Sequence, residues 1–370
     1  MKIFHCDHCG ALVFFENISC LRCGHALGFL PDIMDLAALE PEKDQQWRSL
    51  SAAAPGRLYR ACANGGNQAV CNWFVPADEP DEFCAACRLN AVVPDATLPE
   101  NHAAWHKIEI AKRRLIYTLR QQALATEGDP SNQSPRLQFR FLADTPASGP
   151  VLTGHEGGVI TLNIAEADDV EREKRRAQWH EPQRTLLGHF RHESGHYYWD
   201  VLIANSSLQK PFRSLFGDER ADYAAALQAH YARGPSPDWA SRCVSAYAST
   251  HPWEDWAETW AHYLHMVDSL ETAAGFGLSL RPRHPSAPLI SADPQKALHR
   301  GATFDTLLEH WFPLTFALNS LNRGIGLADL YPFVLSPPVV DKLRFVHDTI
   351  ARREPVNETA PGAEPALELV

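Results

Sequence analysis

At 370 residues, 45% of them hydrophobic, the chain is long enough to bury one sizeable core and a smaller module, so we expect two domains. Its formal net charge of −11 argues against electrostatic binding of DNA, RNA or anionic lipid, because such binding needs clustered Lys and Arg. We find no signal peptide and no uncharged apolar stretch of roughly 18 residues, and we therefore expect a cytoplasmic protein that does not enter the membrane.

Cysteines mark the first predicted domain, residues 1–98. Eight of the nine cysteines fall before residue 90, in spacings typical of metal ligands and not of the disulfides of a secreted protein. Two CxxC pairs, each followed by glycine, have the form of a zinc ribbon and predict one structural zinc site: Cys6, Cys9, Cys20 and Cys23. A second, more loosely spaced set predicts another four-cysteine site: Cys62, Cys71, Cys84 and Cys87. The remaining Cys243 stands alone in an apolar context, and we expect a small buried side chain there.

The charge of this first domain bears on what it binds. Zinc ribbons often bind nucleic acid, but residues 1–98 contain seven Lys and Arg against twelve Asp and Glu. We therefore expect the domain to bind protein or to cover part of the second domain, and we do not expect a nucleic-acid partner.

A change of pattern after the polar stretch Pro94–Asn101 marks the second predicted domain, residues 99–352. From Ala103 apolar residues recur with helical period, which predicts a long amphipathic helix. Two strands should follow, at 137–142 and at 159–164 (VITLNI), and the second could add an extended peptide to its edge. Further helices are predicted downstream, at 221–232, 253–270, 304–321 and 341–352. The segment 353–370, rich in Pro, Glu and Ala, predicts a disordered tail. The fold class is therefore α+β and rich in helix.

The strongest functional signal is an HExxH match, His192-Glu193-Ser194-Gly195-His196, on a helix that we expect to begin near Pro182. Residues four apart lie on the same face of a helix, so His192 and His196 can bind one zinc ion while Glu193 reaches a water on it. Zinc lowers the pKa of such a water to roughly 7, and a glutamate can then take its proton. Gly195 costs a helix interior about 1 kcal/mol relative to Ala, which a purely structural helix would avoid unless it packs closely against another.

A catalytic zinc site needs a third protein ligand, and it must come from later in the chain. The extended HExxHxxGxxH form is absent, because Trp199 and Leu202 stand where its glycine and third histidine would be. The best candidate is the segment His251–Trp260 (HPWEDWAETW), which begins a helix with an early Pro and first-turn carboxylates.

Other groups are weaker candidates. Asp218 or Glu219 in the FGDER segment is a further choice for the ligand. His262 and His265 are expected to be core or surface groups of a helix packed by tryptophans. Asp200, four residues after His196, either orients that ligand or is exposed.

The two helical segments resemble those of the gluzincin metallopeptidases. This resemblance implies that Glu254 is the third zinc ligand and that Glu258, four residues on, orients the first histidine ligand from behind. If the register is shifted, Glu258 is the ligand and Glu254 faces solvent. The EDWAETW segment also resembles the corresponding helix of the anthrax lethal factor group, which implies that Tyr247, seven residues before Glu254, helps to stabilise the transition state.

The cysteine clusters and the LLGHFRHESGHYYWD segment together resemble a bacterial family of zinc-binding metallopeptidases with an N-terminal zinc-ribbon domain. The resemblance extends from Cys6 to the segment Tyr331–His347. It implies a zincin-like peptidase domain behind a small double zinc-ribbon domain, with one catalytic and one or two structural zinc ions. The implied substrate is a peptide or protein, with Glu193 as general base. The alternatives are a zinc-ribbon adaptor with an inactive peptidase fold and a nucleic-acid-associated protease, which the acidic composition disfavours.

Overall fold

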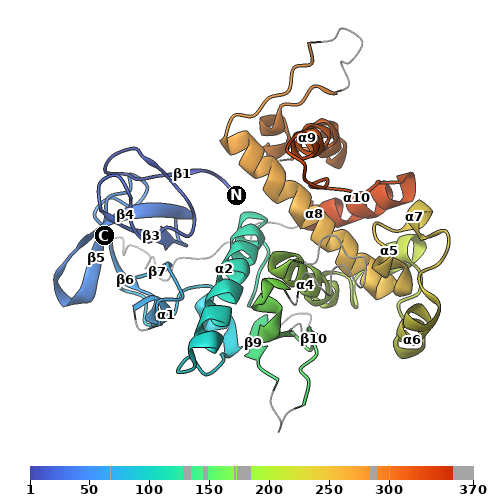
Figure 1. The fold of residues 1–370 in the computed structure, drawn as a ribbon, viewed down its shortest axis with the longest axis horizontal. Helices are drawn as coiled ribbons and strands as arrows, with labels where there is room; N and C mark the ends of the chain where they lie inside the picture. The colour runs from blue at the N-terminus through green and yellow to red at the C-terminus, as the bar shows by residue number, and fades with distance from the viewer. Residues whose placement is uncertain are drawn as a thin grey trace, which may run out of the picture.

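The computed structural model describes residues 1–66, 68–127, 135–144, 149–170, 172, 185–283, 290–299 and 301–352. The predicted tail at 353–370 lies outside these residues, as does Pro182. The fold is α+β, as predicted: a β-rich N-terminal region lies beside a mainly helical second half (Figure 1).

The N-terminal region contains two antiparallel sheets. A short hairpin, β1 (Phe4–His5) and β2 (Leu12–Val13), precedes a five-stranded sheet whose strands pair in chain order. These strands are β3 (Ala26–Leu30), β4 (Asp35–Pro41), β5 (Gln46–Ser49), β6 (Leu58–Ala61) and β7 (Phe74–Pro76). The short helix α1 (Ala63–Gly66) follows β6. The sequence did not predict this sheet, because its strands are short and Gly and Pro interrupt the pattern.

The long helix α2 (Pro99–Gln121) joins the two halves of the molecule, and in Figure 1 it lies between the N-terminal sheet and α4. Its Tyr117 ring contacts the rings of Phe15 and Phe29, with centroids 5.7 and 6.0 Å apart. Its Trp105, Ile108, Leu115 and Leu119 are buried, as the helical period predicted. This buried face makes α2 part of one core that continues from the cysteine-rich region into the helical half.

A four-stranded sheet with the order β10-β11-β9-β8 packs beside α2. Its strands are β8 (Asn90–Val92), β9 (Gln138–Leu142), β10 (Gly154–Glu156) and β11 (Val159–Asn163). The two predicted strands are present as β9 and β11. β8 precedes residue 98 in the chain yet pairs with β9. The expectation that the VITLNI strand offers a free edge is wrong, because β11 pairs with β9 on one side and with β10 on the other.

The second half is built around two helices that cross, α4 (Leu186–Leu202) and α8 (Pro252–Gly275), the long helix that runs diagonally in Figure 1. The chain between these two helices forms four shorter elements: α5 (Gln209–Phe216), α6 (Tyr223–Arg233), α7 (Trp239–Arg242) and the 3-10 turn η4 (Tyr247–Thr250). The last helices are α9 (Phe304–Gly324) and α10 (Pro337–Ala351). All four helices predicted downstream of the HExxH motif are present, with ends shifted by a few residues. Within the described part of the chain, none of the helices is long and apolar enough to span a membrane.

Candidate metal centre

The HExxH motif lies in the middle of α4. The helix begins at Leu186, where the Thr185 hydroxyl caps it by accepting a hydrogen bond of 2.9 Å from the Gly188 amide. His192 and His196 are therefore one helical turn apart, on the face that meets α8, and Glu193 is buried beside them.

Gly195 allows α4 and α8 to approach closely at this point. A Cβ atom on Gly195 would lie 2.8 Å from the Cα of Ala257 and 3.2 Å from the Cβ of Trp260. Trp256 donates a hydrogen bond of 2.8 Å to the Gly195 carbonyl, and Trp260 donates one of 3.1 Å to the Ser194 hydroxyl. Close helix packing thus explains the glycine, and this packing sets the distance between the histidines of α4 and the carboxylates of α8.

The first turn of α8 presents the third candidate ligand. His251 caps the helix by accepting a hydrogen bond from the Trp253 amide, and its Nε2 is 3.1 Å from the Ala221 carbonyl oxygen. Pro252 occupies the first turn, as the sequence predicted, and acidic residues there are favoured by the helix dipole. Glu254, which is 1% exposed, consequently points its carboxylate at the two imidazoles of α4.

The three side chains converge with the spacing that a tetrahedral zinc ion requires. The Nε2 atoms of His192 and His196 are 3.2 Å apart. The Glu254 carboxylate lies 3.0 Å from Nε2 of His192 and 3.6 Å from Nε2 of His196. Two nitrogens bonded at 2.0–2.1 Å to a tetrahedral zinc would be about 3.3 Å apart, so the donor set fits this metal.

The charges around these ligands also favour a cation. Burial alone would lower the pKa of His192, but hydrogen bonds with Glu254 and Glu258 raise it well above its usual value. Burial would raise the pKa of Glu254, yet the two histidines hold it well below its usual value. Glu254 is therefore ionised beside the two imidazoles, and a bound metal ion would replace the proton that His192 holds.

Glu258 lies one turn after Glu254 and touches the far side of the first histidine. Its Oε1 is 2.7 Å from Nδ1 of His192, while Nε2 of the same ring faces Glu254. The Ser245 hydroxyl donates a 2.6 Å hydrogen bond to the other oxygen of Glu258. A carboxylate in this position fixes the orientation of a metal-binding imidazole. Glu254, and not Glu258, thus lies among the candidate ligands, while Glu258 contacts the ring nitrogen of His192 that faces away from them.

Two tyrosines line the same centre. The Tyr247 ring of η4 lies 5.9 Å from the ring of His192. The hydroxyl of Tyr223, which sequence reasoning missed, donates a 2.8 Å hydrogen bond to Glu254. Burial and the negative charge of Glu254 raise the pKa of both tyrosines, so both remain hydrogen-bond donors at neutral pH. No local pattern marks Tyr223, because it is 31 positions from its partner.

The surroundings of His196 differ from those of His192. The Trp253 ring packs against it at a centroid distance of 4.1 Å, and the ring of His155, on the edge strand β10, lies 6.4 Å away. His155 was also missed, because its contact is set by the sheet. Among the described residues, Nδ1 of His196 has no hydrogen-bond partner, so the suggested orienting role of Asp200 is not seen. Burial raises the pKa of Asp200 to about 6.

The weaker candidate ligands have other partners. Asp218 pairs with Arg220, and Glu219 pairs with Arg213. His262 is buried, with its Nδ1 2.7 Å from the hydroxyl of Tyr331. His265 packs against the rings of Trp311 and Tyr331, at 5.8 and 5.4 Å.

Both cysteine sets are brought together in the N-terminal region. In each set the four sulfur atoms lie within 4.8 Å of one another, and none is in a disulfide: Cys6, Cys9, Cys20 and Cys23 in the first, Cys62, Cys71, Cys84 and Cys87 in the second. In the first set, the sulfur atoms of Cys6 and Cys23 and those of Cys9 and Cys20 are 3.6 Å apart. In the second set, the sulfur atoms of Cys71 and Cys84 are 3.8 Å apart. Four sulfurs at 2.3 Å from a tetrahedral zinc would be about 3.8 Å apart, so both sets fit zinc. The ninth cysteine, Cys243, is buried as expected.

Comparisons with known proteins agree with this arrangement. A family model described as "Putative zinc-binding metallo-peptidase" matches residues 101–349, and a zinc-ribbon domain model matches residues 3–98. Two proteins described as uncharacterised, one from Mycobacterium tuberculosis and one from Mycobacterium bovis, are each 44% identical over 367 residues, which is 99% of this chain and 98% of theirs. No solved structure matches the chain. The first match contains every candidate residue of the α4–α8 centre, and the second contains all eight clustered cysteines.

Proposed function

The chain belongs to this zinc-binding metallo-peptidase family, and on that premise we propose that it hydrolyses peptide bonds at the α4–α8 centre. The observation that carries the proposal is the convergence of His192, His196 and Glu254 on one point. Glu193 projects from the same turn of α4.

The reaction uses these residues in distinct roles. His192, His196 and Glu254 would hold the zinc ion, which when bound would polarise the scissile carbonyl and lower the pKa of a water. Glu193 accepts the proton of the attacking water and passes it to the leaving nitrogen. Tyr247 donates a hydrogen bond to the carbonyl oxygen as negative charge develops there. Tyr223 and Glu258 hold Glu254 and His192 in place.

The edge strand β10 is the proposed place for the substrate backbone. β10 pairs only with β11 in the described part of the chain, and it packs against α4. An extended peptide that added a strand here would run past His155 and so close to His196. β10 thus takes the role that the sequence suggested for the VITLNI strand.

Replacing Glu193 with Gln tests the function. The change removes the general base but no metal ligand, so zinc content should be unchanged while cleavage of a peptide library, followed by mass spectrometry, falls by roughly 10²–10⁴-fold. Glu309→Gln, the same change at an exposed position of α9, should leave cleavage unaltered. A wild-type protein that retains zinc but cleaves nothing would favour the adaptor alternative, and cleavage that survives Glu193→Gln would contradict the mechanism.

A further inference from the structure

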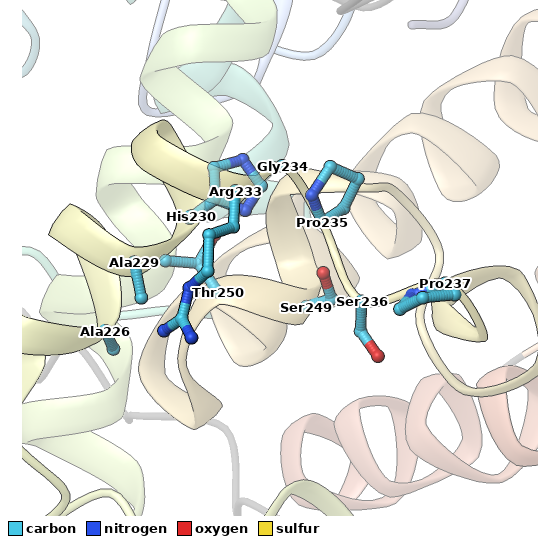
Figure 2. Close-up of a pocket in the computed structure, with 10 residues that line it drawn as sticks. All are labelled: Ala226, Ala229, His230, Arg233, Gly234, Pro235, Ser236, Pro237, Ser249 and Thr250. Carbon is cyan, nitrogen blue, oxygen red and sulfur yellow. The ribbon is translucent and has the colours of Figure 1, made fainter.

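A cavity of about 380 Å³ lies beside the candidate centre, between α6, the segment that follows it, and η4. Figure 2 shows its lining: residues of α6 on the left, the segment 235–237 on the right, and Ser249 and Thr250 of η4 between them. Arg233, at the end of α6, is the only Lys or Arg among the residues that line it.

Two elements, α6 and η4, contribute residues both to the cavity and to the centre. One face of α6, with residues three or four apart, carries Tyr223, Ala226, His230 and Arg233. Tyr223 at one end bonds to Glu254, and the other three residues line the cavity. The turn η4 is shared in the same way, because Tyr247 faces His192 and also lies 6.0 Å, ring to ring, from His230.

Arg233 differs from the arginines around it. Arg220 and Arg242 each pair with an aspartate at 2.6 and 3.0 Å. No carboxylate in the described part of the chain lies within ion-pair distance of Arg233. The nearby Asp238 is already bound by Arg242 and by the Ser236 hydroxyl. A cation in the last turn of a helix does interact with the helix dipole, but that leaves the five N–H donors of the guanidinium available to a ligand.

We propose that this cavity is a distal subsite in which Arg233 binds a carboxylate of the peptide substrate, either an acidic side chain or the C-terminal carboxylate. A guanidinium and a carboxylate can form two parallel charge-assisted hydrogen bonds, which gives both attraction and orientation. Thr250 also lines the cavity, and its buried hydroxyl has no hydrogen-bond partner among the described residues. The inference rests on the proposed peptidase function, because it assigns a subsite to that substrate.

The position of the subsite along the substrate follows from the geometry of α6. Tyr223 and Arg233 are ten residues apart, which is about 15 Å along a helix. An extended peptide spans about 3.3 Å per residue, so the carboxylate should lie about four to five residues from the scissile bond. The expected substrates are therefore peptides with an acidic residue, or a chain end, at that distance from the cleavage point.

The test compares matched peptides on the zinc-loaded full chain. Each peptide carries Glu or Gln three to five residues from the cleaved bond, and each is made with a free and with an amidated C-terminus. For wild type, kcat/KM should be about tenfold or more higher for the carboxylate-bearing peptide of a pair. A difference between the Glu and Gln peptides indicates that Arg233 binds a side-chain carboxylate, and a difference between the free and amidated peptides indicates that it binds the C-terminal carboxylate. Arg233→Ala should bring the ratio to about one, and Arg233→Glu should favour peptides with Lys at that position. Arg220→Ala, which removes an exposed arginine outside the cavity lining, is the control and should keep the preference.

A binding measurement separates this proposal from the proposed function. In the Glu193→Gln background, fluorescence anisotropy should show tighter binding of the same labelled acidic peptides only when Arg233 is present. Such binding without any cleavage by the wild-type protein would contradict the peptidase function and leave the subsite intact. Equal binding of acidic and neutral peptides, or a preference that survives Arg233→Ala, would overturn the subsite.

Discussion

Replacing Gly195 with Ala probes the contact that brings the two halves of the candidate centre together. The added methyl group would lie 2.8 Å from the Cα and 3.2 Å from the carbonyl oxygen of Ala257, and both are backbone atoms that cannot rotate away. Ordinary contacts between carbon atoms are 3.5–4.0 Å, so α4 and α8 would have to separate by about 0.7–1.2 Å. Overpacking of this kind costs roughly 1–3 kcal/mol, against a gain of about 1 kcal/mol in helix propensity. We therefore expect the free energy of unfolding to fall by up to about 2 kcal/mol.

The same displacement should weaken metal binding, because zinc–ligand distances tolerate changes of only about 0.2 Å. Urea unfolding measures the stability, and competition with a chelator measures zinc affinity at the α4–α8 centre. Gly324→Ala, at the end of α9, is the matched control, because its methyl group would meet nothing within 4 Å. If Gly195→Ala proved as stable as wild type and bound zinc equally well, α4 and α8 could not be packed as closely as described.

Three further predictions concern single side chains. Glu258→Gln should keep the fold but raise the dissociation constant for zinc by about 10–100-fold, because Nδ1 of His192 loses its charged partner; unchanged affinity would contradict its orienting role. Tyr247→Phe should leave zinc content unaltered and lower kcat by roughly 10²-fold with little change in KM, and an effect on KM alone would exclude transition-state stabilisation. Burial, with nearby Arg191 and His262, lowers the pKa of His265 to about 3, so the unfolded chain binds a proton below pH 6.5 that the folded chain does not. Stability should therefore fall by up to about 1.4 kcal/mol per pH unit as pH drops from 6.5 toward 3, and urea unfolding should show a shallower dependence in His265→Gln.

The parts of the centre that depend on local spacing could be predicted from the sequence. His192 and His196 are four residues apart and therefore lie on the same face of a helix in any fold that keeps this segment helical. Glu254 and Glu258, also four residues apart, lie on one face of α8 for the same reason. The resemblance to gluzincins implied that Glu254 binds the metal and Glu258 orients His192, and in the structure the two glutamates contact opposite nitrogens of the His192 ring.

The parts that depend on long-range contacts could not be predicted. Tyr223 reaches Glu254 through the placement of α6, and His155 reaches His196 through the pairing of β10 with β11. The composition of β11 correctly predicted a strand. Its pairing partners, β9 and β10, are set by the fold, and the sequence therefore did not show that both edges of β11 are occupied. The close packing that requires Gly195 is also a long-range contact, because it depends on the approach of Ala257 from α8.

The central claim is that three separate groups of side chains bind metal, and that one of them is the His192, His196 and Glu254 centre. Zinc per chain, measured by elemental analysis of the purified protein, tests this most directly. Wild type should contain three zinc ions and His192→Ala two, while His189→Ala, a histidine one turn earlier on α4 that pairs with Glu166, should keep three. A wild-type value of two that does not change in His192→Ala would show that the α4–α8 centre holds no zinc and would contradict the account.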